Sequence, residues 1–349
     1  MHVGYGLITA QHHPNDRRSD VEIYREGIEL AVEAERLGFA TVWTSEHHFV
    51  DDGYMPSQLP FLAAVAARTE RILLGTGVLL APMFDPLHLA EDAATVDLIS
   101  NGRLILGLGI GWRDEEFRGL GGADGHKGHR LEAIIEILHQ AWSDDLVLGD
   151  RGGIYRYPAP GFNVTPKPSR PGGPPIWIGA GAPVAVERAG RLADGYLSSR
   201  IAPAGLAERV DLLRQGAVAA GRDPGAVTAA IHHPVFAWRD GDAWPVVREL
   251  ARYMAWKYED MDDARGSTAR RLPPPMTDEV ETQLRRRTIA GTPDQVIEQI
   301  EAYRGAIGPE GHFVARAYFP GLDPAIQRES LQVLGEEVLP KLAARSAPP

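Results

Sequence analysis

The chain has 349 residues, of which 44% are hydrophobic, so it can form two ordinary domains or one large α/β barrel. Its net charge of -11 argues against nucleic-acid and anionic-membrane partners, and the absence of cysteine excludes disulfides, thiolate nucleophiles and cysteine metal sites. No signal peptide and no apolar run of the ~20 residues needed to cross a membrane are visible, so we expect a cytoplasmic protein.

Strands and helices alternate strictly along the first third of the chain. Apolar runs predict the strands, and helical periodicity with N-terminal capping signals predicts the helices. Such alternation is typical of parallel strands covered by helices. The expected segments are strands at 3–8, 39–44, 72–80 and 103–108, and helices from a capping box at Ser19 and Glu22 to Leu37, at 60–68, and from Asp85 and Pro86 to Ile99.

The same alternation continues to the end of the chain. We count eight strands with eight helices and predict a (β/α)8 TIM barrel that forms a single domain over residues 1–349. Two segments, 149–173 after the fourth helix and 239–289 after the seventh strand, break the repeat and are predicted as insertions. The expected segments are helices at 130–142, 183–192, 203–220, 293–306 and 324–339, and strands at 175–178, 195–198, 227–238 and 312–319.

The end of the second expected strand carries the densest group of polar side chains. Thr41, Val42 and Trp43 suit a short buried strand, and the run Ser45-Glu46-His47-His48 follows them. The carboxyl ends of the strands carry the chemistry of α/β barrels, so this run is a candidate active site. A polar loop with one buried histidine is the alternative.

Glycine-rich runs follow three other strands. Gly75-Thr76-Gly77 and the run from Gly107 to Trp112 permit close approach of a flat ligand to the backbone, although the second does not have dinucleotide-fingerprint spacing. The run Gly179 to Ala185 opens a helix, where free amides and the helix dipole suit a phosphate. Ordinary turns are the alternative for the second and third runs.

Histidines occur in three adjacent pairs, at residues 12–13, 47–48 and 232–233, each toward the carboxyl end of an expected strand. Neighbouring residues on a strand point to opposite faces, so at most one histidine of each pair can face the barrel mouth. We therefore predict no metal site.

With these motifs placed, the chain resembles the bacterial luciferase-like monooxygenase family, a family of flavin-dependent oxidoreductases. The resemblance runs nearly end to end and is tightest over residues 37–120. The motifs that carry it are Trp43-x-x-Glu46-His47-His48-Phe49, Gly75-Thr76-Gly77, Ser100-Asn101-Gly102-Arg103, Gly107-x-Gly109-x-Gly111-Trp112 with Glu116-Phe117, and Glu337-Val338-Leu339-Pro340.

The resemblance implies an enzyme that uses reduced FMN and O2 to oxygenate a small organic substrate. His47 corresponds to the catalytic histidine, Glu46 would orient the flavin or the histidine, and a non-proline cis peptide is implied at Gly77-Val78. A histidine of ordinary pKa, about 6.5, suits proton transfer near neutral pH. The implied cofactor-binding residues are Gly77, Val78, Gly109, Gly111, Trp112, Arg130, Gly179, Gly181, Ala182, Ala185, Ser199 and Arg200.

The chain departs from the luciferase pattern at several of these positions. A cysteine and an arginine of that pattern are replaced by Gly109 and Ile110, so one phosphate-binding arginine is missing. After the sixth strand the luciferase pattern has Ser-Trp, whereas this chain has Ser199 and Arg200. We hypothesise that Arg200 supplies the missing positive charge. Arg130 matches a family arginine near the phosphate, although the tyrosine that often follows it is a leucine here.

The same departures occur in relatives that use a deazaflavin coenzyme for hydride transfer, which is the alternative function. Glu-His at positions 46 and 47 favours FMN, because the deazaflavin relatives more often carry Asp-His. A non-catalytic flavin-binding barrel and a metal-dependent hydrolase are further alternatives. No nicotinamide-binding unit is apparent, so we expect a separate flavin reductase, and the family resemblance implies a homodimer.

Overall fold

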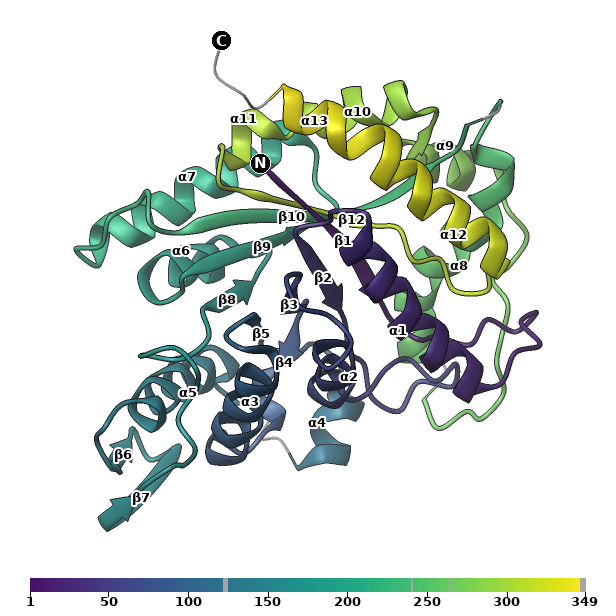
Figure 1. Ribbon diagram of the computed structural model, residues 1–349. Helices are drawn as coiled ribbons and strands as arrows, with labels where there is room; N and C mark the ends of the chain where they lie inside the picture. Colours follow the sequence, from purple (N-terminus) through teal and green to yellow (C-terminus); the bar gives the residue numbers. More distant parts are fainter. Residues whose placement is uncertain (122–124, 240, 264, 346–349) are drawn as a thin grey trace. The chain divides into compact units, whose positions relative to one another are not determined.

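The computed structural model describes residues 1–121, 125–239, 241–263 and 265–345 (Figure 1). Positions 240 and 264 of the insertion predicted over 239–289 thus lie outside the described residues. Two compact units can be distinguished by their internal contacts. Unit 1 comprises Met1–Pro56, Leu197–Asp211 and Thr228–Pro349, and unit 2 comprises Ser57–Tyr196 and Leu212–Val227.

Unit 1 contains the elements at the two ends of the chain. Strand β9 (Gly195–Ser199) and helix α7 (Pro203–Ala219) each contribute residues to both units. The elements that lie wholly in unit 1 are strands β1 (His2–Ile8), β2 (Thr41–Thr44), β10 (Thr228–Ala237), β11 (Ile289–Gly291) and β12 (His312–Arg316), and helices α1 (Asp20–Arg36), α8 (Trp244–Asp263), α9 (Asp278–Arg286), α10 (Pro293–Glu301), α11 (Arg304–Ile307), α12 (Pro324–Val333), the π-helical turn η2 (Leu334–Val338) and α13 (Leu339–Ala344).

The strands of unit 1 pair in parallel in the order β2, β1, β12, β10. His2 pairs with His312, which in turn pairs with Ala230, and Gly4 pairs with Thr41. Strands β9 and β11 both pair with β10. Because all these strands run the same way, the residues after β2 and β9 and at the ends of β10 and β12 lie at one edge of this sheet.

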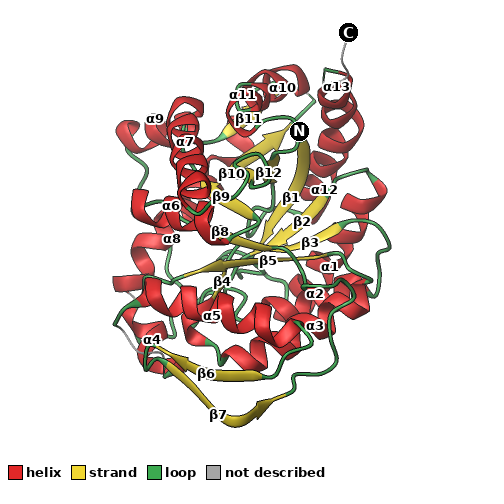
Figure 2. Cartoon of the chain, turned by 90° about the vertical axis from the view of Figure 1, so that its left-hand side faces the viewer, coloured by secondary structure: helices red, strands yellow, loops and turns green. Residues whose placement is uncertain are grey.

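Unit 2 contains the central part of the chain. A two-stranded antiparallel hairpin, β6–β7, lies apart from its parallel strands, and in both views the hairpin lies on the far side of α5 from those strands (Figures 1 and 2). The elements are strands β3 (Leu73–Thr76), β4 (Leu79–Leu80), β5 (Leu104–Gly109), β6 (Val147–Arg151), β7 (Tyr155–Phe162) and β8 (Ile176–Gly179), and helices α2 (Gln58–Ala66), the 3-10 turn η1 (Ala81–Met83), α3 (Pro86–Ser100), α4 (Asp114–Leu120), α5 (Lys127–Trp142) and α6 (Pro183–Leu192).

The parallel strands of unit 2 pair in the order β3, β5, β8, and β4 pairs with the end of β5. Along the whole chain the parallel strand positions are β1, β2, β3 with β4, β5, β8, β9, β10 and β12, with helices between them. The fold is therefore an α/β TIM barrel, and the prediction of the fold class is confirmed.

The local signals also predicted the helix starts. Ser19 and Glu22 form the expected capping box, Asp85 accepts from two amides at the start of α3, and the amide of Thr292 donates to Gln295 Oε1 at 2.9 Å. The segment predicted as a helix over 293–306 is two helices, α10 and α11, and the last helix is interrupted by the π-helical turn η2.

Other predicted boundaries differ from the structure. The strand predicted over 72–80 is broken between β3 and β4, and α4 was not predicted. The insertion at 149–173 contains most of the hairpin, and the insertion at 239–289 contains α8 and α9. No helix within the described residues is both long and apolar enough to traverse a lipid bilayer.

Candidate active site

The end of β2 places the expected polar run inside unit 1. Ser45, Glu46, His47 and His48 are all buried. The backbone amide of His47 donates to the carbonyl of Met55 at 3.2 Å, which fixes the chain where it leaves the strand. The following loop thus holds the run in a defined conformation, and a catalytic group needs such a fixed orientation.

Two tyrosines enclose the ring of His47. Tyr54, in the loop after β2, and Tyr258, on α8, both stand edge-on to it, with ring centroids 4.9 and 5.6 Å away and interplanar angles of 84° and 83°. The hydroxyl groups of the two tyrosines are 3.4 Å apart. The imidazole therefore lies in an aromatic setting that limits access of water.

His48 lies in a different environment from its neighbour. Its Nε2 is 3.8 Å from Glu46 Oε1, and its ring is 6.1 Å from that of Phe49, whose side chain is 53% exposed. The two adjacent rings therefore have different surroundings. The catalytic role that the resemblance implies for His47 stays a prediction, and we expect a structural role for His48.

Two arginines set the charge around Tyr258. The guanidinium carbons of Arg200 and Arg316 lie 4.9 and 5.8 Å from the centre of its ring. Burial favours the neutral phenol, but the positive charges of Arg316 and Arg200 outweigh this effect and lower the pKa of Tyr258. The hydroxyl of Tyr258 is therefore more acidic than that of an ordinary tyrosine, whereas burial raises the pKa of Tyr54.

Helix α8 also supports the loop that follows His47. Asp52 accepts hydrogen bonds at 2.8 Å from Gln11 Nε2 and from the hydroxyl of Tyr253. Lys257 Nζ pairs with Asp51 and, at 2.7 Å, with Asp260. Because all three side chains of this ion-paired group are about 1% exposed, the contact between loop and helix is a buried ionic one.

The sequence alone did not predict Tyr54, Tyr258 or Arg316 as site residues, nor Arg287, which lines one cavity with Arg200 and Arg316. Tyr258 and Arg287 lie in the segment that was predicted only as an insertion, and Tyr54 lies in a loop. Helix α8 carries many charged residues along its length, so no local pattern in the sequence singles out Tyr258.

The candidate cofactor residues Gly77, Val78, Gly109 and Gly179 lie together in unit 2. The peptide bond between Gly77 and Val78 is cis, as the resemblance implied. A Cβ at Gly109 would lie 2.5 Å from Val78 Cγ2, and one at Gly179 would lie 2.6 Å from Val78 Cγ1. The two glycines thus leave the space that the side chain of Val78 occupies, a function that the sequence did not indicate.

Beyond β5 the chain turns sharply at Gly111, whose φ of 69° favours glycine. A Cβ there would also lie 3.2 Å from the ring of Phe117. The next residue, Trp112, is 43% exposed and can offer an aromatic surface to a ligand. This exposure suits the cofactor-binding role that the resemblance implies for Trp112.

The N-terminus of α6 is an open group of backbone donors. Within the described residues, the amides of Gly181, Ala182 and Val184 donate no hydrogen bond, and Val184 is 63% exposed. The amide of Ala185 donates to the carbonyl of Ala182 at 2.9 Å. The helix start therefore fits an anionic phosphate through three free amides and the helix dipole.

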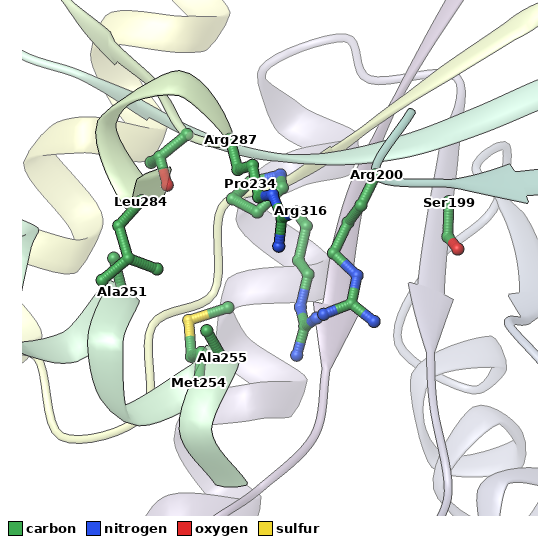
Figure 3. A pocket seen from close by; sticks show the side chains of 10 residues that line it. Ser199, Arg200, Pro234, Ala251, Met254, Ala255, Leu284, Arg287 and Arg316 are labelled. Carbon is green, nitrogen blue, oxygen red and sulfur yellow. The ribbon is translucent and has the colours of Figure 1, made fainter. Parts of the chain in front are cut away.

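Arg130 lies in the first turn of α5, with its guanidinium carbon 5.9 Å from the ring centre of Tyr155 in the hairpin. It is half-buried, and its Nε has no partner among the described residues. Ser199 and Arg200, in unit 1, both line a cavity (Figure 3). The predicted site residues are thus distributed over the two units.

The motif residue Arg103 has a structural function instead. It is buried and donates hydrogen bonds to the carbonyls of Ser100, Ile72, Ala66 and Thr69, at 2.6 to 3.0 Å. These bonds join the ends of α2 and α3 to the starts of β3 and β5. The motif around residues 100–103 therefore stabilises the amino-terminal side of unit 2.

Within the described residues, no group of three or more histidine, aspartate or glutamate side chains could hold a metal ion.

Known proteins resemble this chain over most of its length. The model of the luciferase-like monooxygenase family matches residues 1–309. F420-dependent glucose-6-phosphate dehydrogenase from Nakamurella multipartita is 32% identical over 333 residues, which cover 90% of this chain and 92% of that protein.

The oxygenase component of the flavin-dependent trigonelline monooxygenase from Acinetobacter baylyi is 33% identical over 181 residues. This match covers 51% of the chain and spans about half, 49%, of that protein. The crystal structure of monooxygenase RslO1 from Streptomyces bottropensis superimposes with a TM-score of 0.82 at 24% identity, covering 98% of this chain and 99% of that one. The chain is an oxidoreductase that belongs to the luciferase-like monooxygenase family.

Proposed function

We propose that the chain is the oxygenase component of a monooxygenase that uses reduced FMN and O2 to oxygenate a small organic substrate. The observation that carries this proposal is the position of His47, which is buried at the end of β2, follows Glu46 and is enclosed by Tyr54 and Tyr258. An imidazole that is shielded from bulk water can transfer a proton without competition from solvent.

The residues of unit 2 fit the cofactor. The free amides of Gly181, Ala182 and Val184 suit its phosphate, and the exposed Trp112 offers a flat aromatic surface. When bound, reduced FMN supplies the electrons for the reduction of O2, with one oxygen atom going to the substrate and the other to water. In this scheme His47 donates or accepts the proton, and Glu46 orients the imidazole or the cofactor.

A separate reductase would supply the reduced flavin. The trigonelline relative is named as an oxygenase component, which supports a two-component arrangement. We also propose a homodimer, as the family resemblance implies, and sedimentation of the purified chain tests that proposal.

Hydride transfer with a deazaflavin coenzyme is the second candidate. It is favoured by the F420-dependent dehydrogenase from Nakamurella, which matches 90% of the chain, whereas the trigonelline monooxygenase matches 51%. In this case too, the start of α6 would hold a phosphate group of the cofactor.

Anaerobic titration of the purified chain with reduced FMN and with deazaflavin distinguishes the two candidates. Saturable binding of reduced FMN, followed by uptake of O2 and oxygenation of a substrate, supports the first proposal. Tight binding of the deazaflavin alone, with no binding of reduced FMN, would replace it by the second. Binding of either cofactor without turnover of any substrate would instead support a flavin-binding protein without catalysis.

A further inference from the structure

A cavity of about 320 Å³ in unit 1 combines three arginines with apolar side chains (Figure 3). The arginines come from three different elements: Arg200 follows β9, Arg287 follows α9, and Arg316 ends β12. The apolar lining comes largely from α8 and α9, and Figure 3 shows Met254 and Leu284 across from the arginines. The volume is at the lower end of the range for small-molecule sites, roughly 300–1,000 Å³.

The positive charge of this cavity is not balanced by a carboxylate. None of its lining residues is acidic. Among the residues that the structure describes, Arg200, Arg287 and Arg316 form no ion pair, whereas neighbouring arginines such as Arg285 and Arg248 do. Three cations that share one cavity repel one another, so a bound anion would stabilise the arrangement.

Arg316 is the most informative member of the group because it is 2% exposed. Its Nε has no hydrogen-bond partner within the described residues. A buried donor of a charged group without a partner is costly, and proteins normally satisfy such groups with a counter-ion or a ligand. Figure 3 shows the guanidinium groups of Arg316 and Arg200 next to one another, extending in the same direction.

The surrounding titratable groups report the same positive potential. Burial lowers the pKa of His232, on β10, and the charges of Arg316 and Arg200 lower it further. The same two arginines act on Tyr258, as described above. The local environment therefore disfavours added cations and favours anions.

We propose that this cavity binds the substrate through an anionic group, a phosphate monoester or a carboxylate, held by Arg200, Arg287 and Arg316. The apolar body of the substrate then packs against Met254 and Leu284. This inference rests on the proposed function, because it assigns the anion to the substrate. It gives Arg200 a function that competes with the earlier hypothesis that this residue binds the cofactor phosphate.

Calorimetric titration of the purified full-length chain with inorganic phosphate and with benzoate tests the proposal. We expect saturable binding of at least one probe, and a loss of affinity of about tenfold or more in Arg287→Gln, since a charge-assisted hydrogen bond is removed. Arg286→Gln is the matched control, because it removes the same charge from the adjacent, exposed residue of α9, which does not line the cavity. No binding of either probe to the parent, or equal losses in the two variants, would overturn the proposal.

A second titration separates the substrate from the cofactor as the source of the anion. If the cavity serves the substrate, the probe binds equally well to the chain saturated with reduced FMN, and Arg200→Gln and Arg287→Gln retain the parent affinity for reduced FMN. Loss of probe binding in the FMN-loaded chain, together with weaker FMN binding in these variants, would assign the cavity to the cofactor phosphate. If the chain binds neither FMN nor deazaflavin but still binds phosphate through Arg287, the proposed function fails and the anion site remains.

Discussion

The hydroxyl of Tyr258 lies 3.4 Å from that of Tyr54, and both rings stand edge-on to His47. The two phenols differ in acidity, because burial raises the pKa of Tyr54, whereas the charges of Arg316 and Arg200 outweigh burial and lower that of Tyr258. A proton can therefore be shared unequally between two groups that both contact the candidate catalytic imidazole.

The ionisation of Tyr258 is directly measurable. The parent should show one tyrosine that ionises below the usual pH of about 10, seen as a rise in absorbance near 295 nm. In Tyr258→Phe this early step should disappear, whereas Tyr24→Phe, a change on α1 at a tyrosine whose pKa is raised by burial, should retain it. Identical titration curves for the parent and Tyr258→Phe would contradict the assigned acidity.

The two adjacent histidines should differ in their effect on turnover. Because His47 lies between the tyrosines, His47→Ala should lower kcat by about 100-fold or more, the usual contribution of a general acid or base. His48→Ala should cost much less, since that side chain lies beside Glu46 and an exposed phenylalanine. Affinity for the reduced cofactor provides the check on folding, and equal losses of kcat would show that the roles are assigned wrongly.

The space around Val78 can be tested by adding single methyl groups. Gly109→Ala places a Cβ 2.5 Å from Val78 Cγ2, so it should lower the free energy of unfolding by about 1–3 kcal/mol. Gly305→Ala is the control, because nothing lies within 4 Å of its Cβ. Chemical denaturation gives both values. In the double variant Gly109→Ala with Val78→Ala the clash is relieved. The loss of unfolding free energy in the double variant should therefore be smaller than the sum of the losses in the two single variants. Strictly additive losses would be evidence against the contact.

Buried His312 should make stability fall in mild acid. Burial, with the nearby His2 and the terminal amine, lowers its pKa from 6.5 to about 3. The unfolded chain therefore binds a proton below pH 6.5 that the folded chain excludes, and stability is lost as the pH falls from about 6.5 toward 3, by at most about 1.4 kcal/mol per pH unit.

The comparison of unfolding free energies at pH 7 and pH 5 isolates this effect. His312→Leu should show a smaller decrease than the parent over that interval, where most carboxylates remain ionised. If the variant does not fold, an NMR titration of the histidine ring signals of the parent gives the pKa directly. A ring at position 312 that titrates near 6.5 would contradict the expectation.

Local signals predicted the repeating parts of this molecule well. Capping residues such as Ser19 and Asp85 act through their own backbone neighbours, so the sequence shows where α1 and α3 begin. The position of the Glu46 and His47 motif at the end of a strand followed from the same alternation.

The remainder of the candidate site depends on contacts between distant segments. Tyr54 and Tyr258 are 204 positions apart in the sequence. Arg200 and Arg316, which are also far apart in the sequence, both lie near the ring of Tyr258. No periodicity in the sequence reports such contacts. Likewise, the glycine-rich runs at the ends of β5 and β8 suggested a ligand surface. The structure instead shows Val78 against Gly109 and Gly179, because a missing Cβ can admit a protein side chain as well as a ligand.

The ionic contact between α8 and the loop after β2 also limits how this enzyme can be re-engineered. Lys257 and Tyr253 bind Asp51 and Asp52, so the helix that lines the arginine cavity is joined to the loop that holds His47. A graft of residues 239–289 from a relative with another substrate would remove the buried cation that pairs with Asp51 and one hydrogen-bond donor of Asp52, unless the grafted segment carries an equivalent cation and hydroxyl. Residues 49–56 and 239–289 should therefore be exchanged as a pair, and substrate range in such barrels would change through coupled replacements of these two segments.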